Sequence, residues 1–313
     1  MSHVIKAVVK APLAASPAAL GVVVTHYRTP ELLLECLQNL TLHAPSASVL
    51  VVDTGGEAAA STQAKQAFPA VRFIEAVNHS LANAVNTGLK QTDASFVLQM
   101  NADVMLAAGV VEAMLARFDD EAVGMVGPRC RTPTGAWQNQ GLFYRPYYVC
   151  LGLSGRPAVQ VPWLSGCCQL LRREALDRTG GMNSSLRFYN EDVEWSWRLR
   201  RAGYRCELVR EAVLHVGGAS TPADDRFLLE GLRGGAALSR QYKSKPYRSL
   251  HALGVLGFAA WQSRRRTGGN APDDKTVYKN VARMFRTEQF NESPFGPTLN
   301  DANPAFLREE AET

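Results

Sequence analysis

The stretch "LGVVVTHYRTPELLLECLQNLTLHAPSASVLVVD", residues 20–53, contains the pattern that decides the fold. It opens with the short apolar run "LGVVVT" (20–25) and closes with a second one, "SVLVVD" (48–53). Runs of this length and composition are typical of buried strands. Between them, Thr29 followed by Pro30 is a common start of a helix. The stretch therefore predicts a strand, a helix and a second strand.

The same unit recurs over the next part of the chain. Two further buried strands are predicted at "VRFIEA" (71–76) and "SFVLQM" (95–100). Further helices are predicted to begin at Glu57, Ser80 and Ala107. Strands that alternate with helices indicate an α/β domain, in which a mostly parallel central sheet is flanked by helices.

The composition is that of a globular protein with one large or two ordinary domains. Its 313 residues, 46% of them hydrophobic, are enough for a sizeable core. The net charge of +5 is compatible with an anionic ligand or an anionic membrane surface, and no motif for nucleic-acid binding occurs. Six cysteines without a C-x-x-C pair favour reduced thiols. No run approaches the ~20 apolar residues of a membrane-spanning helix. We therefore expect a cytoplasmic protein, at most associated with the inner face of the membrane, without a nucleic-acid partner.

Polar residues follow three of the predicted strands at the point where each strand ends. They are Thr25 to Arg28, Asp53 to Gly56 and Asn101 to Asp103. In parallel sheets, ligands bind beyond the carboxyl ends of the strands. The first of these turns has no glycine, and no G-K-[ST] sequence occurs, so neither a dinucleotide-binding loop nor a phosphate loop is indicated. What remains is a cleft with an acid after the second strand and another after the fourth, although either acid is equally well explained as a turn former.

The stretch "RFYNEDVEWSWRLRRAG" (187–203) places two carboxylates, Glu191 and Asp192, side by side. Asn190 before them favours the start of a helix, acids in a first helical turn interact well with the helix dipole, and Gly203 fits the end of that helix. The pair is therefore either the capped start of a helix or the chemical centre of an enzyme. This stretch alone does not decide between the two.

Two segments between these regions are also informative. "GPRCRTPTGAWQNQGLFYRPYY" (127–148) predicts a long loop over an active site, or a small aromatic core. "WLSGCCQLLRREAL" (163–176) predicts a buried strand followed by a short helix. Within it, Gly166 offers a position at which a ligand can approach closely.

Seven motifs occur in a fixed order between Gly21 and Ser220. They are "VVVTHYR", "VVDTGG", "NHSLANAVNTG", "LQMNADV", "SGCCQLLRREAL", "YNEDVEWSWRLRRAGY" and "LHVGGAS". In this order the chain resembles the family-2 glycosyltransferases with the GT-A fold, and within them the bacterial rhamnosyltransferase-like enzymes. The resemblance implies a GT-A catalytic domain that transfers a sugar from a nucleotide donor.

The resemblance also implies a metal site and a catalytic base. Asp103, in the Asn101-Ala102-Asp103 motif, stands where the family has its D-x-D or N-x-D motif and is the expected ligand of Mg²⁺ or Mn²⁺. His215 matches a position that can complete the metal site, and Asp192 matches the catalytic base. Asn101 lacks the first carboxylate of a D-x-D motif, so one charge is missing from this site.

Other positions implied by the resemblance bind the donor or line its site. Thr25 and Asp53 are expected to hold the nucleoside, and Glu191 is expected to have a structural or orienting role. Trp195 either packs in the core or stacks on a sugar. The full donor-binding set is Thr25, Tyr27, Arg28, Asp53, Asn78, Asn86, Asn101, Gly166, Glu191 and Trp195.

The sequence therefore predicts an inverting, metal-dependent glycosyltransferase of cell-surface polysaccharide synthesis. It is expected to move one hexose, with rhamnose as a candidate, from a dTDP-, UDP- or GDP-linked donor to a glycan or polyprenyl-linked acceptor. A single transfer is expected because the arginine-tryptophan motif of processive polysaccharide synthases is absent. Two alternatives stay open: a non-catalytic scaffold that binds a nucleotide sugar or glycan, and a nucleotidyltransferase. The turn "THYRTPE" is not the glycine-rich basic loop expected of the latter.

Three parts of the chain are predicted: an N-terminal arm (1–18), the catalytic domain (19–220) and a C-terminal helical extension with a tail (221–313). In the extension, "RFLLEGLRGGAALSRQY" and "PYRSLHALGVLGFAAWQSRRR" predict two helices, and the polar tail from Asn270 onward predicts an extended arm. The second helix is apolar and flanked by Lys and Arg. It therefore contacts a membrane surface, packs on the catalytic domain or pairs with a second subunit in a homodimer.

Overall fold

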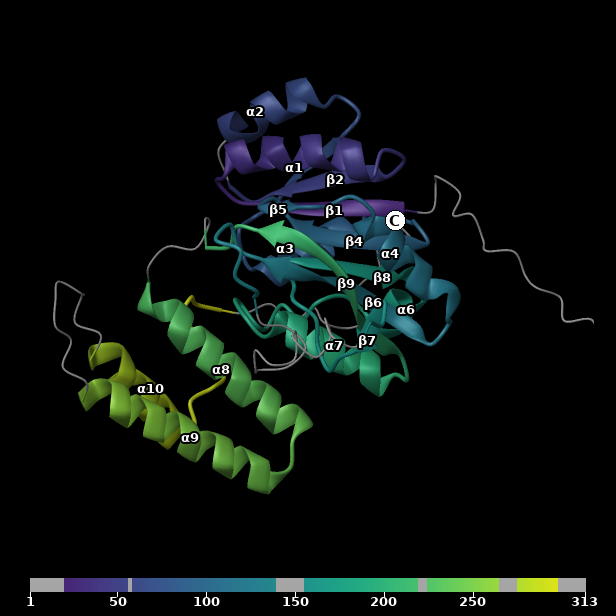
Figure 1. Ribbon diagram of the computed structural model, residues 1–313. Helices are drawn as coiled ribbons and strands as arrows, with labels where there is room; N and C mark the ends of the chain where they lie inside the picture. The colour runs from purple at the N-terminus through teal and green to yellow at the C-terminus, as the bar shows by residue number, and fades with distance from the viewer. Residues whose placement is uncertain (1–19, 56–57, 139–154, 219–223, 265–274, 298–313) are drawn as a thin grey trace, which may run out of the picture.

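The chain forms an α/β domain around a nine-stranded sheet, with a unit of three helices at one side (Figure 1). The structure is a computed structural model that describes residues 20–55, 58–138, 155–218, 224–264 and 275–297. The predicted N-terminal arm lies outside the described residues, as do positions 139–148 of the predicted loop.

The strands follow the prediction closely in the first third of the chain. In chain order they are β1 (Leu20–His26), β2 (Ser48–Asp53), β3 (Arg72–Glu75), β4 (Phe96–Asn101), β5 (Val104–Met105), β6 (Val123–Arg131), β7 (Ala158–Gln160), β8 (Cys168–Arg172) and β9 (Arg205–His215). Their order in the sheet is β3-β2-β1-β4-β8-β6-β9-β5, with β7 beside β9. The first four strands in this order are parallel, as expected. The remainder is mixed, because β8 runs antiparallel to both β4 and β6, and β5 and β7 run antiparallel to β9.

The helices connect these strands and extend beyond them. They are α1 (Pro30–His43), α2 (Ala58–Ala67), α3 (Leu81–Leu89), α4 (Val110–Leu115), α6 (Arg173–Thr179), α7 (Glu191–Arg201), α8 (Asp225–Tyr242), α9 (Lys245–Arg264) and α10 (Lys275–Thr287). Ser80 caps α3, since its Oγ accepts a hydrogen bond from the Asn83 N–H at 3.0 Å. Thr29 precedes α1 without a side-chain cap. The prediction of an extended arm after Asn270 is wrong, because helix α10 forms there.

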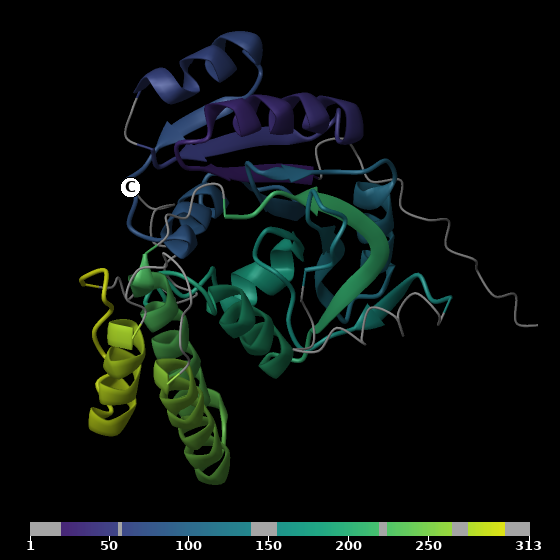
Figure 2. The ribbon, with the colours of Figure 1, turned by 60° about the vertical axis from the view of Figure 1, so that its left-hand side comes forward.

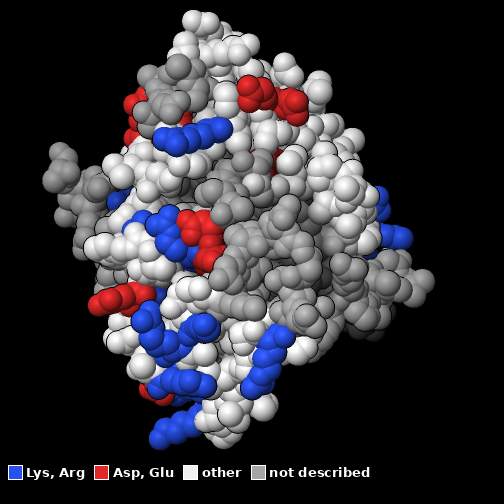
Figure 3. Space-filling model, turned by 90° about the vertical axis from the view of Figure 1, so that its left-hand side faces the viewer, with Lys and Arg blue, Asp and Glu red and all other residues white. Residues whose placement is uncertain are grey.

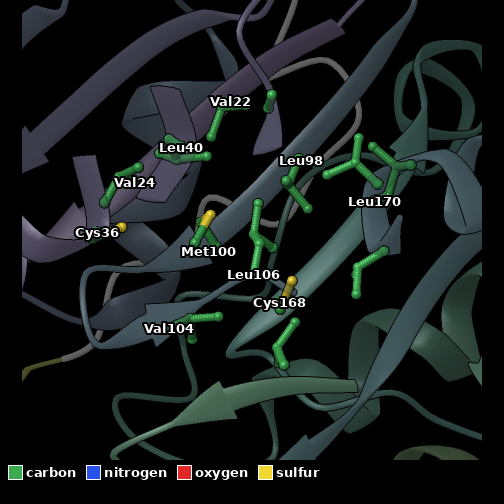
Figure 4. Close-up of a cluster of buried hydrophobic side chains, with 14 of the residues drawn as sticks. Val22, Val24, Cys36, Leu40, Leu98, Met100, Val104, Leu106, Cys168 and Leu170 are labelled. Atoms are coloured by element: carbon green, nitrogen blue, oxygen red, sulfur yellow. The ribbon is translucent and has the colours of Figure 1, made fainter. Parts of the chain in front are cut away.

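The core lies on both faces of the sheet, and β1 shows why. Side chains alternate across a strand, so Val22 and Val24 contact the α1 side, where they pack with Leu40 (Figure 4). Val23 points to the opposite side and packs with Val85 of α3. Helices α1 and α4 cover one face, and α3, α6 and α7 cover the other. A strand covered on both faces has to be apolar throughout, as "LGVVV" is.

The three C-terminal helices form a layer of their own and are joined to the α/β domain by the hydrogen bonds of a buried ion pair. Figure 2 shows α8, α9 and α10 side by side. On α8, Arg233 donates to Glu230 at 2.6 and 2.8 Å, and both side chains are buried. The remaining bonds of the pair cross to other segments: Glu230 accepts from the Arg187 N–H at 3.0 Å, and Arg233 donates to the Ser185 carbonyl at 2.9 Å and to the Phe290 carbonyl at 3.0 Å.

A glycine allows α8 to approach α7 closely. A Cβ atom at Gly234 would lie 2.8 Å from Nδ2 of Asn190, which is closer than packed atoms come. That asparagine is the predicted cap of α7, but its side chain donates to the Gly231 carbonyl of α8 at 2.8 Å and caps nothing. The backbone of Asn190 adopts φ of 70°, a left-handed conformation that asparagine tolerates. The "GG" inside α8 is therefore a contact site between helices.

We expect Glu230→Gln to lower the free energy of unfolding by about 3 kcal/mol, because it leaves the buried Arg233 guanidinium without its counter-charge. Equilibrium unfolding in urea, followed by circular dichroism, measures this change. Glu288→Gln is the matched control, since it removes a carboxylate from an exposed pair with Arg240 and should cost less than about 1 kcal/mol. Equal effects of the two substitutions would contradict the anchoring role of Glu230.

Candidate active site

A cleft of about 620 Å³ opens beyond the carboxyl ends of β1 and β4, where the sequence predicts it. Its floor comes from these strands, and its rim from the starts of α3, α7 and α8. Its volume is in the range of small-molecule sites. Seven of the predicted site residues line it: Thr25, Tyr27, Asn78, Asn101, Asp103, Glu191 and His215.

The parallel register of the sheet brings together the strand ends that carry Thr25 and Asp53, the two residues predicted to hold the nucleoside. In β1, Thr25 lies opposite Asn101 of β4, and its Oγ1 donates to the Asn101 Oδ1 at 3.2 Å. The next residue, His26, lies opposite Asp53 of β2, and its Nδ1 donates to the Asp53 Oδ1 at 3.1 Å. His26 Nε2 accepts from the Thr29 N–H, which settles that the proton is on Nδ1. His26 lines the cleft, whereas Asp53 lies beneath it.

Asp103 and His215 meet through the short pairing of β5 with β9. Val104 of β5 lies opposite His215, so the residue before it, Asp103, is brought to the same point. Oδ1 of Asp103 is 3.5 Å from Nε2 of His215. Oδ2 accepts from the Gly217 N–H at 3.0 Å, but the buried Oδ1 has no hydrogen-bond partner. An unpaired buried carboxylate oxygen beside an imidazole nitrogen is suited to a divalent cation.

Gln138, which sequence reasoning missed, orients the histidine. Nδ1 of His215 donates to the Gln138 Oε1 at 2.6 Å, and Gln138 Nε2 donates back to the His215 carbonyl at 3.3 Å. In the neutral imidazole this leaves the lone pair on Nε2, the nitrogen that faces Asp103. Polar residues in a loop after a strand are common, so no signal in the sequence distinguished Gln138.

Asp103 and His215 are suitable ligands for Mg²⁺ or Mn²⁺, but two protein ligands are fewer than such an ion requires. Within the described ranges, no group of three or more His, Cys, Asp or Glu could hold a metal ion. Asp103 and His215 would therefore share such an ion with water and substrate oxygens, as is usual for Mg²⁺. Burial lowers the pKa of His215, but Cys167 and Asp103 raise it more, and the net shift is upward. The surroundings of the His215 imidazole therefore favour a positive charge at this point of the cleft.

Asp192 is held by backbone groups at the start of α7. Its Oδ2 accepts from the Gly166 N–H at 2.9 Å, and its Oδ1 accepts from the Val193 N–H at 2.8 Å. A Cβ atom at position 166 would lie 3.1 Å from the Asp192 Cβ, so Gly166 leaves room for the carboxylate. Burial raises the pKa of Asp192 to about 6, and these two N–H donors oppose that rise.

From the sequence, Arg187 or Arg198 is expected to lie near Asp192 and keep it ionised, but neither arginine contacts it. Arg198 binds Glu194 at 2.8 Å and donates to the Gly181 carbonyl at 2.6 Å. Arg187 donates to the Pro297 carbonyl at 2.7 Å, and its Nη1 lies 3.0 Å from Nδ1 of His79. Arg187 instead lines the cleft, with a buried Nε that has no hydrogen-bond partner. The sequence places arginines near the site, but only the packing of the folded chain decides which group each arginine contacts.

Glu191 differs from its neighbour in both environment and acidity. It lines the cleft, and its buried Oε2 has no hydrogen-bond partner. Burial and the adjacent Asp192 charge raise the pKa of Glu191 to about 8. Of the two, Asp192 is therefore the stronger acid, and Glu191 keeps its proton to the higher pH. Tyr189, which precedes them, and Asn190 adopt left-handed backbone angles, a strain that concentrates at functional sites.

Five of the predicted donor-binding residues do not line the cleft: Arg28, Asp53, Asn86, Gly166 and Trp195. Asn86 is fully buried and exchanges two hydrogen bonds of 2.8 Å with the Met182 backbone. Trp195 is fully buried and donates to the Gly180 carbonyl at 2.9 Å, so it packs in the core. Arg28 donates to the Gly55 carbonyl at 3.2 Å and stacks over Tyr27. Asn86 and Trp195 have no surface to offer a donor, which corrects the prediction for both.

Comparison with known proteins identifies the family. Residues 21–180 match the model for "Glycosyl transferase family 2". The chain belongs to the family-2 glycosyltransferases. The N-acetylglucosaminyl-diphospho-decaprenol L-rhamnosyltransferase of Mycobacterium tuberculosis is 31% identical to this glycosyltransferase over 214 residues, covering 56% of this chain and 69% of that protein. The pre-mycofactocin glycosyltransferase of the same organism is 29% identical over 178 residues, covering 54% and 37% of the two chains.

Solved structures confirm the GT-A type of fold for this glycosyltransferase. The mannosyltransferase PcManGT from Pyrobaculum calidifontis, solved with GDP-Man and Mn²⁺, superposes with a TM-score of 0.55 at 17% identity, covering 96% of this chain and 89% of that one. GalNAc-T7, solved with UDP, GalNAc and Mn²⁺, gives a TM-score of 0.59 at 12% identity, covering 90% and 59%. At these identities the likeness establishes the fold alone.

We expect Gln138→Leu to weaken Mn²⁺ binding by roughly 10- to 100-fold, because His215 loses the partner that fixes its ring and tautomer. Titration with Mn²⁺ in the presence of UDP, dTDP or GDP, followed by electron paramagnetic resonance, measures the affinity. Gln138→Glu keeps an acceptor oxygen opposite Nδ1 and should restore binding. An unchanged affinity in Gln138→Leu would remove Gln138 from the site.

Proposed function

We propose that this glycosyltransferase is an inverting, metal-dependent enzyme that moves one sugar from a nucleoside-diphosphate donor to an acceptor hydroxyl. The observation that carries the proposal is the pairing, around one cleft, of two different acidic groups. Asp103 with His215 is suited to a cation, and Asp192, which does not itself line the cleft but directly follows the cleft-lining Glu191, is the more acidic of those two carboxyl groups. A glycosyl transfer needs both a neutralised leaving group and a base.

In the proposed step, Asp192 acts as the base. The acceptor oxygen forms a bond to the anomeric carbon while the bond from that carbon to the diphosphate oxygen breaks. The hydroxyl proton passes to the Asp192 carboxylate, which the Gly166 and Val193 N–H groups hold in one orientation. A direct displacement of this kind inverts the configuration and requires no covalent enzyme intermediate.

The leaving diphosphate is stabilised by a second group of residues, which comprises Asp103, His215, Arg187 and Glu191. A Mg²⁺ or Mn²⁺ ion held by Asp103 and His215 would supply positive charge to the diphosphate oxygens. Arg187 adds a fixed positive charge to the cleft wall. Protonated Glu191 can donate a hydrogen bond to a donor oxygen, a role that its raised pKa permits. The presence of Mn²⁺ with PcManGT and with GalNAc-T7 supports the metal requirement.

The relatives narrow the choice of donor and acceptor. The Mycobacterium tuberculosis relative with 31% identity is named as an L-rhamnosyltransferase that acts on a decaprenyl-diphosphate-linked sugar. By this likeness, a deoxyhexose such as rhamnose is the leading donor sugar, and a polyprenyl-linked glycan the leading acceptor. The donor-binding predictions for Thr25, Tyr27, Asn78 and Asn101 stay with this proposal, since all four residues line the cleft.

We expect Asp192→Asn to reduce transfer by roughly 100- to 10,000-fold, because an amide cannot accept the proton. Release of nucleoside diphosphate from dTDP-, UDP- and GDP-sugars, with Mn²⁺, Mg²⁺ or EDTA and with polyprenyl-linked and free glycan acceptors, measures this loss. Donor binding by Asp192→Asn, followed by calorimetry, should remain, and Asp119→Asn, at an exposed position, should behave as the wild type. Binding without release from any donor by the wild type would favour a non-catalytic scaffold.

We expect kcat/KM to rise with pH through about 6, because Asp192 accepts a proton only when ionised and its pKa is raised to about 6. Below that value kcat/KM should fall roughly tenfold per pH unit. Steady-state kinetics at saturating metal, from about two pH units below this pKa to about three units above it, measure the profile. Glu191→Gln should keep this acidic limb and lose any change near pH 8. An acidic limb that disappears in Glu191→Gln would assign the base to Glu191.

A further inference from the structure

Helix α9 carries an apolar stripe that faces solvent along its length. Leu250, Leu253 and Trp261 are 71%, 67% and 52% exposed, and Phe258 is 40% exposed. These positions recur with the spacing of one helical face. Two glycines on the same face add no polar group, and a Cβ atom at either would meet open space. The α9 stripe therefore consists of Leu250, Leu253, Gly254, Gly257, Phe258 and Trp261.

The opposite face of α9 is already occupied. Val255 and Ala259 are buried in a cluster with Phe285 of α10 and Ala236 of α8. Packing within the three-helix unit therefore accounts for one side of α9 and leaves the stripe uncovered. This excludes the earlier alternative that the apolar residues of the stripe pack on the catalytic domain. An exposed contiguous apolar face of this kind marks an interaction site.

The charged side chains of α9 and α10 themselves have one sign. The sequences of α9 and α10 contain no Asp or Glu. Lys245 and Arg264 are exposed at the two ends of α9, and Lys279, Arg283 and Arg286 are exposed on α10. Figure 3 shows Lys and Arg gathered on the lower part of this side of the molecule, with few acidic side chains among them. The partner that fits such a surface is anionic.

A groove beside the α9 stripe is lined by both apolar and basic residues. It lies between α9 and α10, has a volume of about 450 Å³, and is lined by Leu256 and Ala260 together with basic residues. The basic residues are Arg264, Lys279, Arg283 and Arg286. A lining that is part apolar and part basic matches an acyl chain that ends in an anionic headgroup.

We propose that the α9 stripe and this groove form a surface that binds an anionic lipid bilayer. The stripe would lie in the interface, with Trp261 at headgroup level, while the cations of α10 meet lipid phosphates. No helix in the described ranges is long and apolar enough to cross a bilayer, so the contact lies along the surface. A second copy of the chain fits less well, because it would bring basic helices against basic helices.

The same three-helix unit reaches the cleft. Asp224, Arg226 and Phe227, at the start of α8, line it. A bilayer on α9 would therefore hold the cleft near lipids, where a lipid-linked acceptor resides. The membrane proposal does not depend on sugar transfer, since it rests on α9 and α10 alone. The test below uses neither donor nor acceptor, so its failure is separate from a failure of the proposed function.

The apolar part of the surface is tested by flotation of the full chain with vesicles of phosphatidylcholine alone and of phosphatidylcholine mixed with phosphatidylglycerol. We expect binding to the mixed vesicles only. The double variant Leu250→Ser with Trp261→Ser should bind roughly thirtyfold less. The control Leu42→Ser with Val77→Ser removes two side chains that are at least as exposed, 74% and 81%, from elsewhere on the surface, and should bind as the wild type does.

The charged part is tested with Arg283→Gln combined with Arg286→Gln, which should also bind roughly thirtyfold less. The control Arg200→Gln with Arg210→Gln removes two exposed arginines of the catalytic domain and should have no effect. Absence of flotation, or equal losses in variant and control, would overturn the proposal. A dimer in analytical ultracentrifugation that Leu250→Ser with Trp261→Ser dissociates, without vesicle binding, would assign the stripe to a second copy and also overturn it.

Discussion

Burial of β1 on both faces is the constraint on which the rest of the structure depends. Because helices cover both sides of the strand, Val22, Val23 and Val24 leave no place for polar groups within it. Polar residues begin where the cover of β1 ends, at Thr25 and His26, and β2 likewise becomes polar at its end, at Asp53. The parallel register then aligns these ends, so each polar residue finds a partner across the sheet. The cleft is the consequence of that alignment.

The two adjacent carboxyl groups at the start of α7 differ in acidity because their surroundings differ. Asp192 accepts hydrogen bonds from two backbone N–H groups, which oppose the rise of its pKa, whereas burial and the adjacent Asp192 charge raise the pKa of Glu191 further. Neither pKa follows from residue type, since both are ordinary acids in peptides. The arginines that sequence reasoning assigned to Asp192 are engaged elsewhere. Backbone donors, which no side-chain pattern reveals, take their place.

The alternation of strands and helices up to β4 could be predicted because both signals are local. Apolar runs mark the strands, and Ser80 and Pro30 mark helix starts. The second half of the sheet could not be predicted in the same way, because β8 lies between β4 and β6 and β9 lies between β6 and β5. Such pairings join residues far apart in the chain, and no local pattern encodes them. The helix α10 was missed because its apolar residues, Val277, Val281 and Phe285, are spaced among many charges.

The sequence by itself determined the α/β class, the edge of the sheet where the cleft opens, and the residue types that serve it. Asp103, Glu191, Asp192 and His215 could all be named from their motifs. Only the tertiary structure decided what they do together: the pairing of β5 with β9 brings His215 to Asp103, and Gln138 fixes its ring. It also removed Asn86 and Trp195 from the site and left the α9 stripe in solvent. The physical reason is that motifs record chemistry along the chain, whereas burial and partners arise from long-range packing.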